Sequence, residues 1–172
     1  ISARFIQQGV KLQSSNRLRY TLPVEGDIVE YREVLLDKMG YDDVKDRIQF
    51  LQGDACNLKP ELTDYNVVFA GNLIDRLYEP KLFLDSITQR ILPGGLLVLT
   101  SPYTWLEEYT DKENWLGGIK VNGENFSTLD ALKQHLGELF EFEDARDVPF
   151  VIRETARKFQ HTNAQMSVWR KK

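Results

Sequence analysis

Three short clusters of turn-forming and polar residues adjoin apolar segments in the first hundred residues. They are Gly53-Asp54-Ala55 after RIQFLQ, Gly71-Asn72-Leu73 after VVFA, and Pro93-Gly94-Gly95 before LLVLTSPY. Residues of these types are common in ordinary turns, so each cluster alone is weak evidence for a site. In an open α/β sheet, however, ligands bind at the carboxyl ends of the strands, where such corners lie. The first two clusters are therefore candidates for a small-molecule site.

The segments around these clusters predict alternating strands and helices. Residues 66–70 and the run LLVLTSPY at 96–103 are apolar enough for strands of a buried parallel sheet, and residues 47–52 are a further predicted strand. Between the first two, the spacing of apolar residues predicts a helix over 79–92 that the Pro-Gly-Gly cluster ends. A strand, a helix and a strand in this order form a βαβ unit with a right-handed crossover. The pattern predicts an α/β fold with a mostly parallel sheet.

The flanking segments predict further elements around this unit. Ser2 is a good N-cap for a first helix that ends near residues 13–16, and the β-rich stretch 17–36, interrupted by PVEGD, predicts a hairpin-like insertion. Residues 42–47 predict a short helix, and residues 103–126 a long loop with a short helix. Ser127 caps a predicted helix that ends near 139. At least two final strands follow, with residues 161–165 as the turn between the last pair.

Composition narrows the class of protein. A length of 172 residues fits a single domain, and no apolar run reaches the roughly 20 residues that a membrane helix needs. A net charge of -4 argues against a general nucleic-acid binder, although the last residues are basic. One cysteine, Cys56, and two histidines without ligand spacing argue against a metal site. We expect a cytoplasmic protein with no metal, no nucleic-acid partner and no membrane partner.

In their order and spacing, the clusters resemble the later motifs of the class I S-adenosylmethionine-dependent methyltransferases. These motifs are a strand followed by an acidic residue, a strand at the switch point of the sheet, and a Pro-Gly-Gly turn before another strand. Longer strings are similar to the C-terminal methyltransferase domain of the bifunctional enzymes of ovothiol biosynthesis: GNLIDRLYEP, LPGGLLVLTSPYTWLEEYT, ENWLGG and DVPFVIRETARKFQHT. The resemblance covers residues 2–172. It implies a Rossmann-like, doubly wound, mostly parallel sheet with a C-terminal antiparallel hairpin.

This resemblance implies S-adenosylmethionine as the cofactor. Asp54 matches the acidic residue that accepts a hydrogen bond from the adenine amino group, and the backbone of Ala55 would lie near the adenine ring. Gly71, Asn72 and Leu73 match the stretch beside the methionine part of the cofactor, where a small residue lets the backbone approach closely. Asp54 and Gly71-Asn72 could instead be plain turn residues.

The resemblance also implies methyl transfer to an imidazole ring nitrogen of a thiol-substituted histidine. A neutral imidazole nitrogen has a free lone pair near pH 7, so the site needs to orient the ring rather than supply a strong base. The candidate catalytic residues are Asn72 and Tyr103. The candidate substrate-binding residues are Asp75, Arg76, Tyr103, Trp105 and Arg153. Asp75 and Arg76 could equally form an exposed ion pair, and Tyr103 and Trp105 could pack within their loop.

The sequence departs from the family at its start. The glycine-rich motif that closes the first strand is absent, as is the acidic residue at the end of the second strand, and Ile1-Ser2-Ala3 resembles the residues that follow that acid. We therefore expect an N-terminally incomplete methyltransferase-like domain over 1–172 that binds the cofactor poorly and self-associates through exposed strand edges. The alternative is a non-catalytic module of the same fold that docks onto or stabilises the upstream sulfoxide synthase region of its polypeptide.

Overall fold

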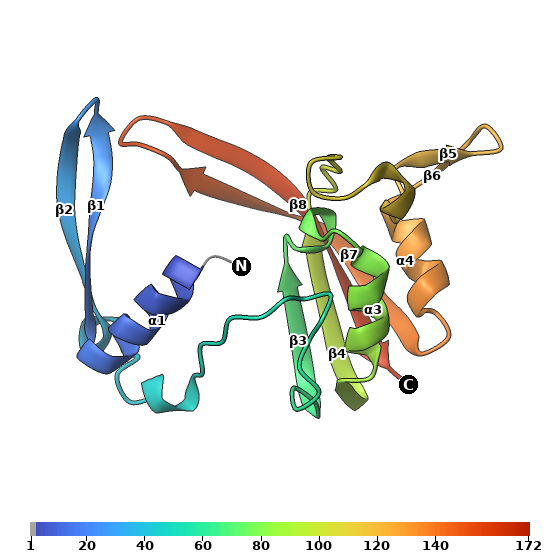
Figure 1. Ribbon diagram of the computed structural model, residues 1–172, viewed down its shortest axis with the longest axis horizontal. Coiled ribbons are helices and arrows are strands. Elements are labelled where there is room, and N and C mark those ends of the chain that lie inside the picture. Colours follow the sequence, from blue (N-terminus) through green and yellow to red (C-terminus); the bar gives the residue numbers. More distant parts are fainter. Residues whose placement is uncertain (1–2) are drawn as a thin grey trace. The chain divides into compact units, whose positions relative to one another are not determined.

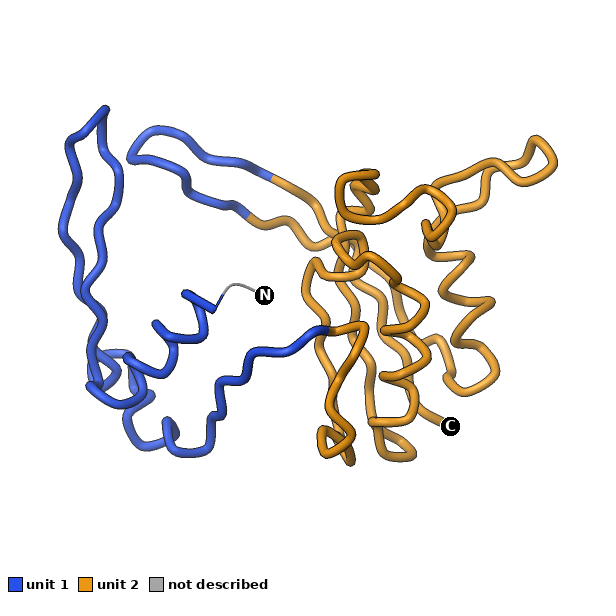
Figure 2. Tube along the Cα trace, viewed as in Figure 1, with its two compact units in different colours: residues 1–54, 151–161 blue, residues 55–150, 162–172 orange. Residues whose placement is uncertain are grey.

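The computed structural model describes residues 3–172, which fall into two compact units. Unit 1 consists of Ile1–Asp54 and Val151–His161, and unit 2 consists of Ala55–Phe150 and Thr162–Lys172 (Figure 2). Ser2, the predicted N-cap of the first helix, lies outside the described residues. Both units contain helices and strands, so the chain has the mixed α/β content that the sequence predicts.

Unit 1 contains a helix and an antiparallel hairpin. Its elements are α1 (Ala3–Ser15), β1 (Arg17–Glu25), β2 (Ile28–Leu35), α2 (Leu36–Met39) and the 3-10 turn η1 (Lys45–Arg47) (Figure 1). Gly26 makes the β1–β2 turn with a φ of 53°, a conformation that glycine adopts without strain. The predicted hairpin within 17–36 is therefore confirmed, and its being an insertion stays a prediction. The amide nitrogen of Ala156 donates to the carbonyl of Pro23 at 3.1 Å, which ties residues 151–161 to β1.

The predicted strand at 47–52 is wrong. Residues 48–53 have no regular secondary structure, and η1 occupies the segment just before them. A strand requires a neighbour for its backbone hydrogen bonds, and no strand within residues 3–172 pairs with this segment. The side-chain amide of Gln13 instead donates to the carbonyl of Ile48 at 2.8 Å.

Unit 2 is built on a four-stranded sheet in the order β3-β4-β8-β7. The strands are β3 (Tyr65–Gly71), β4 (Ile91–Ser101), β7 (Phe140–Arg153) and β8 (Phe159–Lys171), the last two extending into unit 1. β3 and β4 are parallel, which confirms the predicted βαβ unit, whereas β4 and β8 are antiparallel. The prediction of a mostly parallel sheet is not confirmed, because the segment expected to extend the parallel part forms no strand.

The Pro93-Gly94-Gly95 cluster lies inside β4 rather than before it. Tyr65 pairs with Ile91 but Val67 pairs with Leu96, so β4 carries an irregularity that accommodates the extra residues. Because Ile91 already belongs to the strand, α3 (Pro80–Thr88) ends earlier than the predicted helix over 79–92.

The core of unit 2 lies between the sheet and two helices. α3 lies next to α4 (Thr128–Leu136), and both supply apolar side chains to one cluster with β4 and β8 (Figure 1). Alternate β4 residues, including Leu97 and Leu99, are buried in this cluster. On β3, by contrast, Val67 and Phe69 are exposed. The described helices of unit 2 therefore cover one side of the sheet, not the two of a doubly wound fold.

Two turns in the C-terminal half differ from the sequence predictions. Residues 103–126 contain not only the turn η3 (Lys112–Asn114) but also a hairpin of β5 (Ile119–Val121) and β6 (Glu124–Phe126). Its Asn122-Gly123 corner has positive φ at both residues, a strong hairpin signal that the predicted loop overlooked. The final turn lies at 154–158 instead of 161–165. In this turn, the Thr155 hydroxyl accepts hydrogen bonds from the backbone amides of Arg157 and Lys158. His161 therefore lies in β8 and not in a turn.

The predicted cap of the last helix is confirmed. The hydroxyl of Ser127 accepts from the backbone nitrogen of Asp130 at 3.2 Å, and the Asp130 carboxylate accepts from the backbone nitrogen of Ser127. No helix within residues 3–172 has the length and hydropathy to span a membrane. In the same range, no three His, Cys, Asp or Glu side chains lie together as metal ligands would.

Candidate functional site

The parallel strands β3 and β4 both end in residues with left-handed backbone conformations. Asn72 follows β3 with a φ of 50°, and Tyr103 lies two residues beyond β4 with a φ of 51°. The two strand ends are neighbours, because Gly71 pairs with Thr100. Non-glycine residues adopt this conformation at an energetic cost, and such residues concentrate at functional sites. This corner, defined as residues 71–76 and 100–105, is the candidate site.

Asn72 is fixed by the neighbouring strand. Its backbone nitrogen donates to the carbonyl of Thr100 at 2.8 Å, and its side-chain oxygen accepts from the Thr100 hydroxyl at 3.2 Å. The side-chain nitrogen of Asn72 has no hydrogen-bond partner within residues 3–172, and the residue is exposed. Asn72 therefore presents an oriented donor at the end of β3.

The carboxylate of Asp75 is buried beneath this corner. Asp75 lies on the 3-10 turn η2 (Ile74–Arg76) with only 1% of its surface exposed. One carboxylate oxygen accepts from the Ser101 hydroxyl at 2.8 Å, and the other accepts from Arg76 at 2.9 Å and from Thr104 at 3.1 Å. A buried carboxylate with partners on both oxygens is not open to a ligand, so Asp75 joins β4 and its loop to η2.

Arg76 extends the same network to the surface. Its guanidinium group donates to the Thr104 carbonyl at 2.8 Å and to the Thr104 hydroxyl at 2.7 Å, and it lies 4.9 Å from the centre of the Tyr109 ring. About a third of the Arg76 side chain is exposed. The Asp75–Arg76 ion pair is therefore partly buried, and it is not the exposed ion pair that the sequence allowed as an alternative.

Tyr103 is half-buried between the ends of β4 and β8. Its backbone nitrogen donates to the Ser101 hydroxyl at 3.0 Å, and its phenol donates to the side-chain oxygen of Gln165 at 3.1 Å. Burial, assisted by the negative charge of Asp75, raises the pKa of Tyr103 to about 12. The phenol is therefore neutral at physiological pH and acts as a hydrogen-bond donor, not as a base.

Trp105, a predicted substrate-binding residue, is buried and does not lie on the surface. Its indole nitrogen donates to the Thr128 hydroxyl at 3.0 Å, and its ring stacks on Trp115 with 6.2 Å between centres. These contacts fasten the loop after β4 to the start of α4.

The remaining candidates for the cofactor, together with the substrate candidate Arg153, divide between the two units. In unit 2, Ala55 and Leu73 are partly buried against the same core cluster as Tyr103. Gly71 is exposed, and a Cβ added there would lie 2.8 Å from the Phe69 ring. Asp54 and Arg153 belong to unit 1. Asp54 is exposed, and Arg153 donates to the Thr155 carbonyl of its own turn at 3.0 Å.

Two residues of the corner, Ser101 and Thr104, and one that contacts it, Gln165, are not among the candidates that the sequence predicts. The sequence marks Ser101 only as the end of a strand, and no periodicity distinguishes Thr104 from its loop neighbours. The segment HTNAQ predicts a turn because it is rich in turn-forming residues, whereas its last residue, Gln165, pairs with Ser101 across β4 and β8. Its partner in space could be found only from the strand register.

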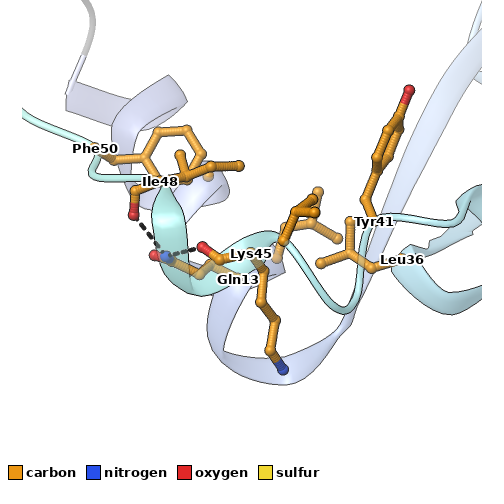
Figure 3. A pocket seen from close by; sticks show the side chains of 9 residues that line it. Gln13, Leu36, Tyr41, Lys45, Ile48 and Phe50 are labelled. Atoms are coloured by element: carbon orange, nitrogen blue, oxygen red, sulfur yellow. Dashed lines mark hydrogen bonds between the residues drawn. The ribbon is translucent and has the colours of Figure 1, made fainter.

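Unit 1 contains a separate apolar cavity of about 240 Å³ (Figure 3). The side-chain nitrogen of Gln13 closes one side by donating to the carbonyls of Lys45 and Ile48, at 2.7 and 2.8 Å. The other lining residues are Gly9, Leu12, Leu36, Tyr41, Val44 and Phe50. Because the Gln13 donors are already used, the cavity offers little polar recognition.

No protein-family model matches the sequence, and no curated protein does. Among solved structures, the N-methyltransferase NodS from Bradyrhizobium japonicum WM9, in complex with S-adenosyl-L-homocysteine, is 11% identical over 77% of this chain and 61% of NodS, with a TM-score of 0.46. A SAM-dependent methyltransferase from Methanosarcina mazei is 14% identical over 78% of this chain and 77% of its own, with a TM-score of 0.46. The cyclase SpnF is 16% identical over 78% of this chain and 61% of SpnF, with a TM-score of 0.49. The chain thus spans about three fifths of NodS and SpnF. Likeness at these scores determines neither the family nor the chemistry of this chain.

Proposed function

We propose that this chain is part of an S-adenosylmethionine-dependent methyltransferase whose donor and acceptor meet at the corner of β3 and β4. The observation that carries the proposal is the pair of left-handed residues, Asn72 and Tyr103, beyond the ends of two adjacent parallel strands. Asn72 lies in a stretch that resembles a methyltransferase motif, and Tyr103 lies in a longer string that is similar to the methyltransferase domain of the ovothiol enzymes. Strained residues at the carboxyl edge of a parallel pair are typical of ligand sites.

The residues of unit 2 fit part of the proposed cofactor. Gly71 exposes its backbone at the end of β3, Asn72 has an unpaired amide nitrogen within the described residues, and Leu73 and Ala55 provide apolar contacts. We assign Asp54 to the adenine amino group on the sequence resemblance alone. No described strand of residues 3–172 ends in the glycine-rich motif of the family. The bound cofactor would supply a methyl group on a positively charged sulfur.

In this proposal, the protein orients the acceptor and does not deprotonate it. A neutral imidazole nitrogen can attack directly, and orientation alone can lower the barrier by several kcal/mol, up to about 7–11 in favourable cases. Tyr103 remains neutral because its pKa is raised to about 12. Its phenol therefore donates a hydrogen bond, which it gives to Gln165 at the edge of the corner. Asp75, Arg76 and Trp105 act on the substrate through the loop that they hold in place. Arg153 stays a prediction.

A thiol-substituted histidine is the proposed acceptor, on the basis of the resemblance to the ovothiol enzymes. The second candidate function is a docking module for an upstream region of the same polypeptide. The exposed side chains of Val67 and Phe69 on edge strand β3 favour this alternative, because such apolar surface commonly marks a contact site.

Calorimetry with S-adenosylhomocysteine tests the proposal. We expect saturable binding, weak in this chain and stronger in a form extended upstream, and at least tenfold weaker binding in Asn72→Ala. Asn163→Ala is the matched control, because Asn163 is an exposed asparagine on β8 outside the corner. If neither the chain nor the extended form binds S-adenosylhomocysteine, the methyltransferase proposal is overturned and the docking module remains.

A further inference from the structure

Gln165 lies at the candidate corner although no motif includes it. It pairs with Ser101, the last residue of β4, so the two side chains project from the same side of the sheet. Its side-chain oxygen accepts the phenol hydrogen of Tyr103 at 3.1 Å. Gln165 therefore belongs to the same edge of unit 2 as Tyr103 and the Ser101–Asp75 contact.

The amide nitrogen of Gln165 is accessible to solvent, and its donors are unused within the described residues. Within residues 3–172 it makes no hydrogen bond, and in that range no buried side-chain nitrogen or oxygen lacks a partner. Since Gln165 is a half-buried residue, its unpaired nitrogen must be accessible to water. An amide nitrogen carries two N–H donors, so this edge offers both of them to an incoming ligand.

Tyr103 fixes the direction of these donors. Its phenol donates to the side-chain oxygen of Gln165 at 3.1 Å, so the amide is held with its oxygen toward Tyr103 and its nitrogen away from it. The carboxylate of Asp75, whose charge acts on Tyr103, already accepts from Arg76, Ser101 and Thr104. The site thus presents an oriented, uncharged donor pair, which suits an electron-rich acceptor and costs little entropy on binding.

We propose that the side-chain nitrogen of Gln165 donates a hydrogen bond to an anionic acceptor of the methyl-accepting substrate and thereby determines substrate specificity. The inference rests on the proposed function for the identity of the substrate. In a thiol-substituted histidine the acceptor is either the thiolate sulfur or the carboxylate. Tyr103 is a positioning residue for this contact.

The test is calorimetric titration of 4-mercaptohistidine into the chain without cofactor. We compare wild type with Gln165→Glu, which keeps an acceptor for Tyr103 but replaces the donors with negative charge, and with Gln165→Met, which removes both. Asn163→Asp is the matched control, because it adds the same charge two residues away on the same strand. Tryptophan fluorescence confirms that each variant is folded.

We expect binding at least tenfold weaker in Gln165→Glu, about three- to tenfold weaker in Gln165→Met, and unchanged in Asn163→Asp, a neutral donor bond being worth about this much. Titration of 4-mercaptoimidazole and of histidine then identifies the acceptor, because the probe that lacks it is insensitive to Gln165. Equal affinity of wild type and Gln165→Glu, or no saturable binding by wild type, overturns the inference. If S-adenosylhomocysteine does not bind but 4-mercaptohistidine still binds in a Gln165-dependent manner, the proposed methyltransferase function is overturned and the role of Gln165 is not.

Discussion

Two ion pairs of nearly equal length lie in very different surroundings. In unit 2, the guanidinium nitrogen of Arg76 lies 2.9 Å from the carboxylate of Asp75, and in unit 1 that of Arg19 lies 2.8 Å from Glu33. Asp75 is almost fully buried, whereas Arg19 is 74% exposed. Exposed pairs contribute little because water screens them, while a buried carboxylate depends on its partners. Burial, and not distance, separates the two pairs.

The apolar residues of the two units differ in the same way. In unit 2, Leu97, Leu99 and Trp169 lose nearly all contact with water, whereas α1 has no buried residue among those described and β1–β2 leaves Ile28 exposed. Similar apolar patterns therefore produce a packed core in one unit and an exposed hairpin and helix in the other. Because Trp105, Trp115 and Trp169 are the chain's three tryptophans and all belong to unit 2, their fluorescence reports selectively on the packed unit.

The largest effect is expected from a change in the unit 2 core. Leu99→Ala removes a fully buried side chain and should lower the free energy of unfolding by about 3 kcal/mol. Ile28→Ala, at the exposed start of β2, should leave the urea midpoint of tryptophan fluorescence unchanged. Equal shifts for the two variants would mean that the units share one core.

The buried network should respond next. Asp75→Asn places an amide where Arg76 and Thr104 need an acceptor, so we expect a loss of about 2 kcal/mol in urea denaturation. Glu33→Gln in unit 1 should have no measurable effect, since both partners reach solvent. A null result for Asp75→Asn would show that the network does not stabilise unit 2.

The cap of α4 should contribute less, and in a pH-dependent manner. Ser127→Ala should cost about 1 kcal/mol, measured by the same denaturation. Hydrogen bonds from Ser127 lower the pKa of Asp130, so the ionised form stabilises the folded state above pH 3.8, the usual pKa, and that stabilisation is lost as pH falls through the lowered pKa. The difference in the free energy of unfolding between wild type and Ser127→Ala should therefore become smaller at acidic pH. A difference that does not change with pH would contradict the capping box.

The smallest effect on stability is expected at Tyr103. Tyr103→Phe removes one hydrogen bond and should cost about 1 kcal/mol or less. The raised pKa predicts stability that is complete below pH 10 and declines as pH rises toward about 12, because the unfolded phenol ionises first. The ultraviolet difference spectrum between wild type and Tyr103→Phe should show ionisation near pH 12, and ionisation near 10 would mean that Tyr103 is not buried.

Strong local signals made three features of unit 2 predictable. The apolar run before Gly71 gave β3, the run before Ser101 gave the end of β4, and Ser127 with Asp130 gave the start of α4. The segment at 47–52 failed because alternation predicts a strand only where a partner is available to receive its hydrogen bonds. At the corner, Asn72 and Tyr103 are predicted from their positions after apolar runs. Gln165 is not predicted, because its contact with Tyr103 joins residues 62 positions apart and no local sequence pattern indicates it.

The sequence alone determined β3, the end of β4 and the start of α4 in unit 2, because apolar runs, turn residues and caps act over a few neighbouring residues. Only the tertiary structure decided that Asp75 is buried among Ser101, Thr104 and Arg76, and that Tyr103 orients Gln165. These contacts depend on strand order and register, which are set by the burial of whole faces and not by any single stretch of residues.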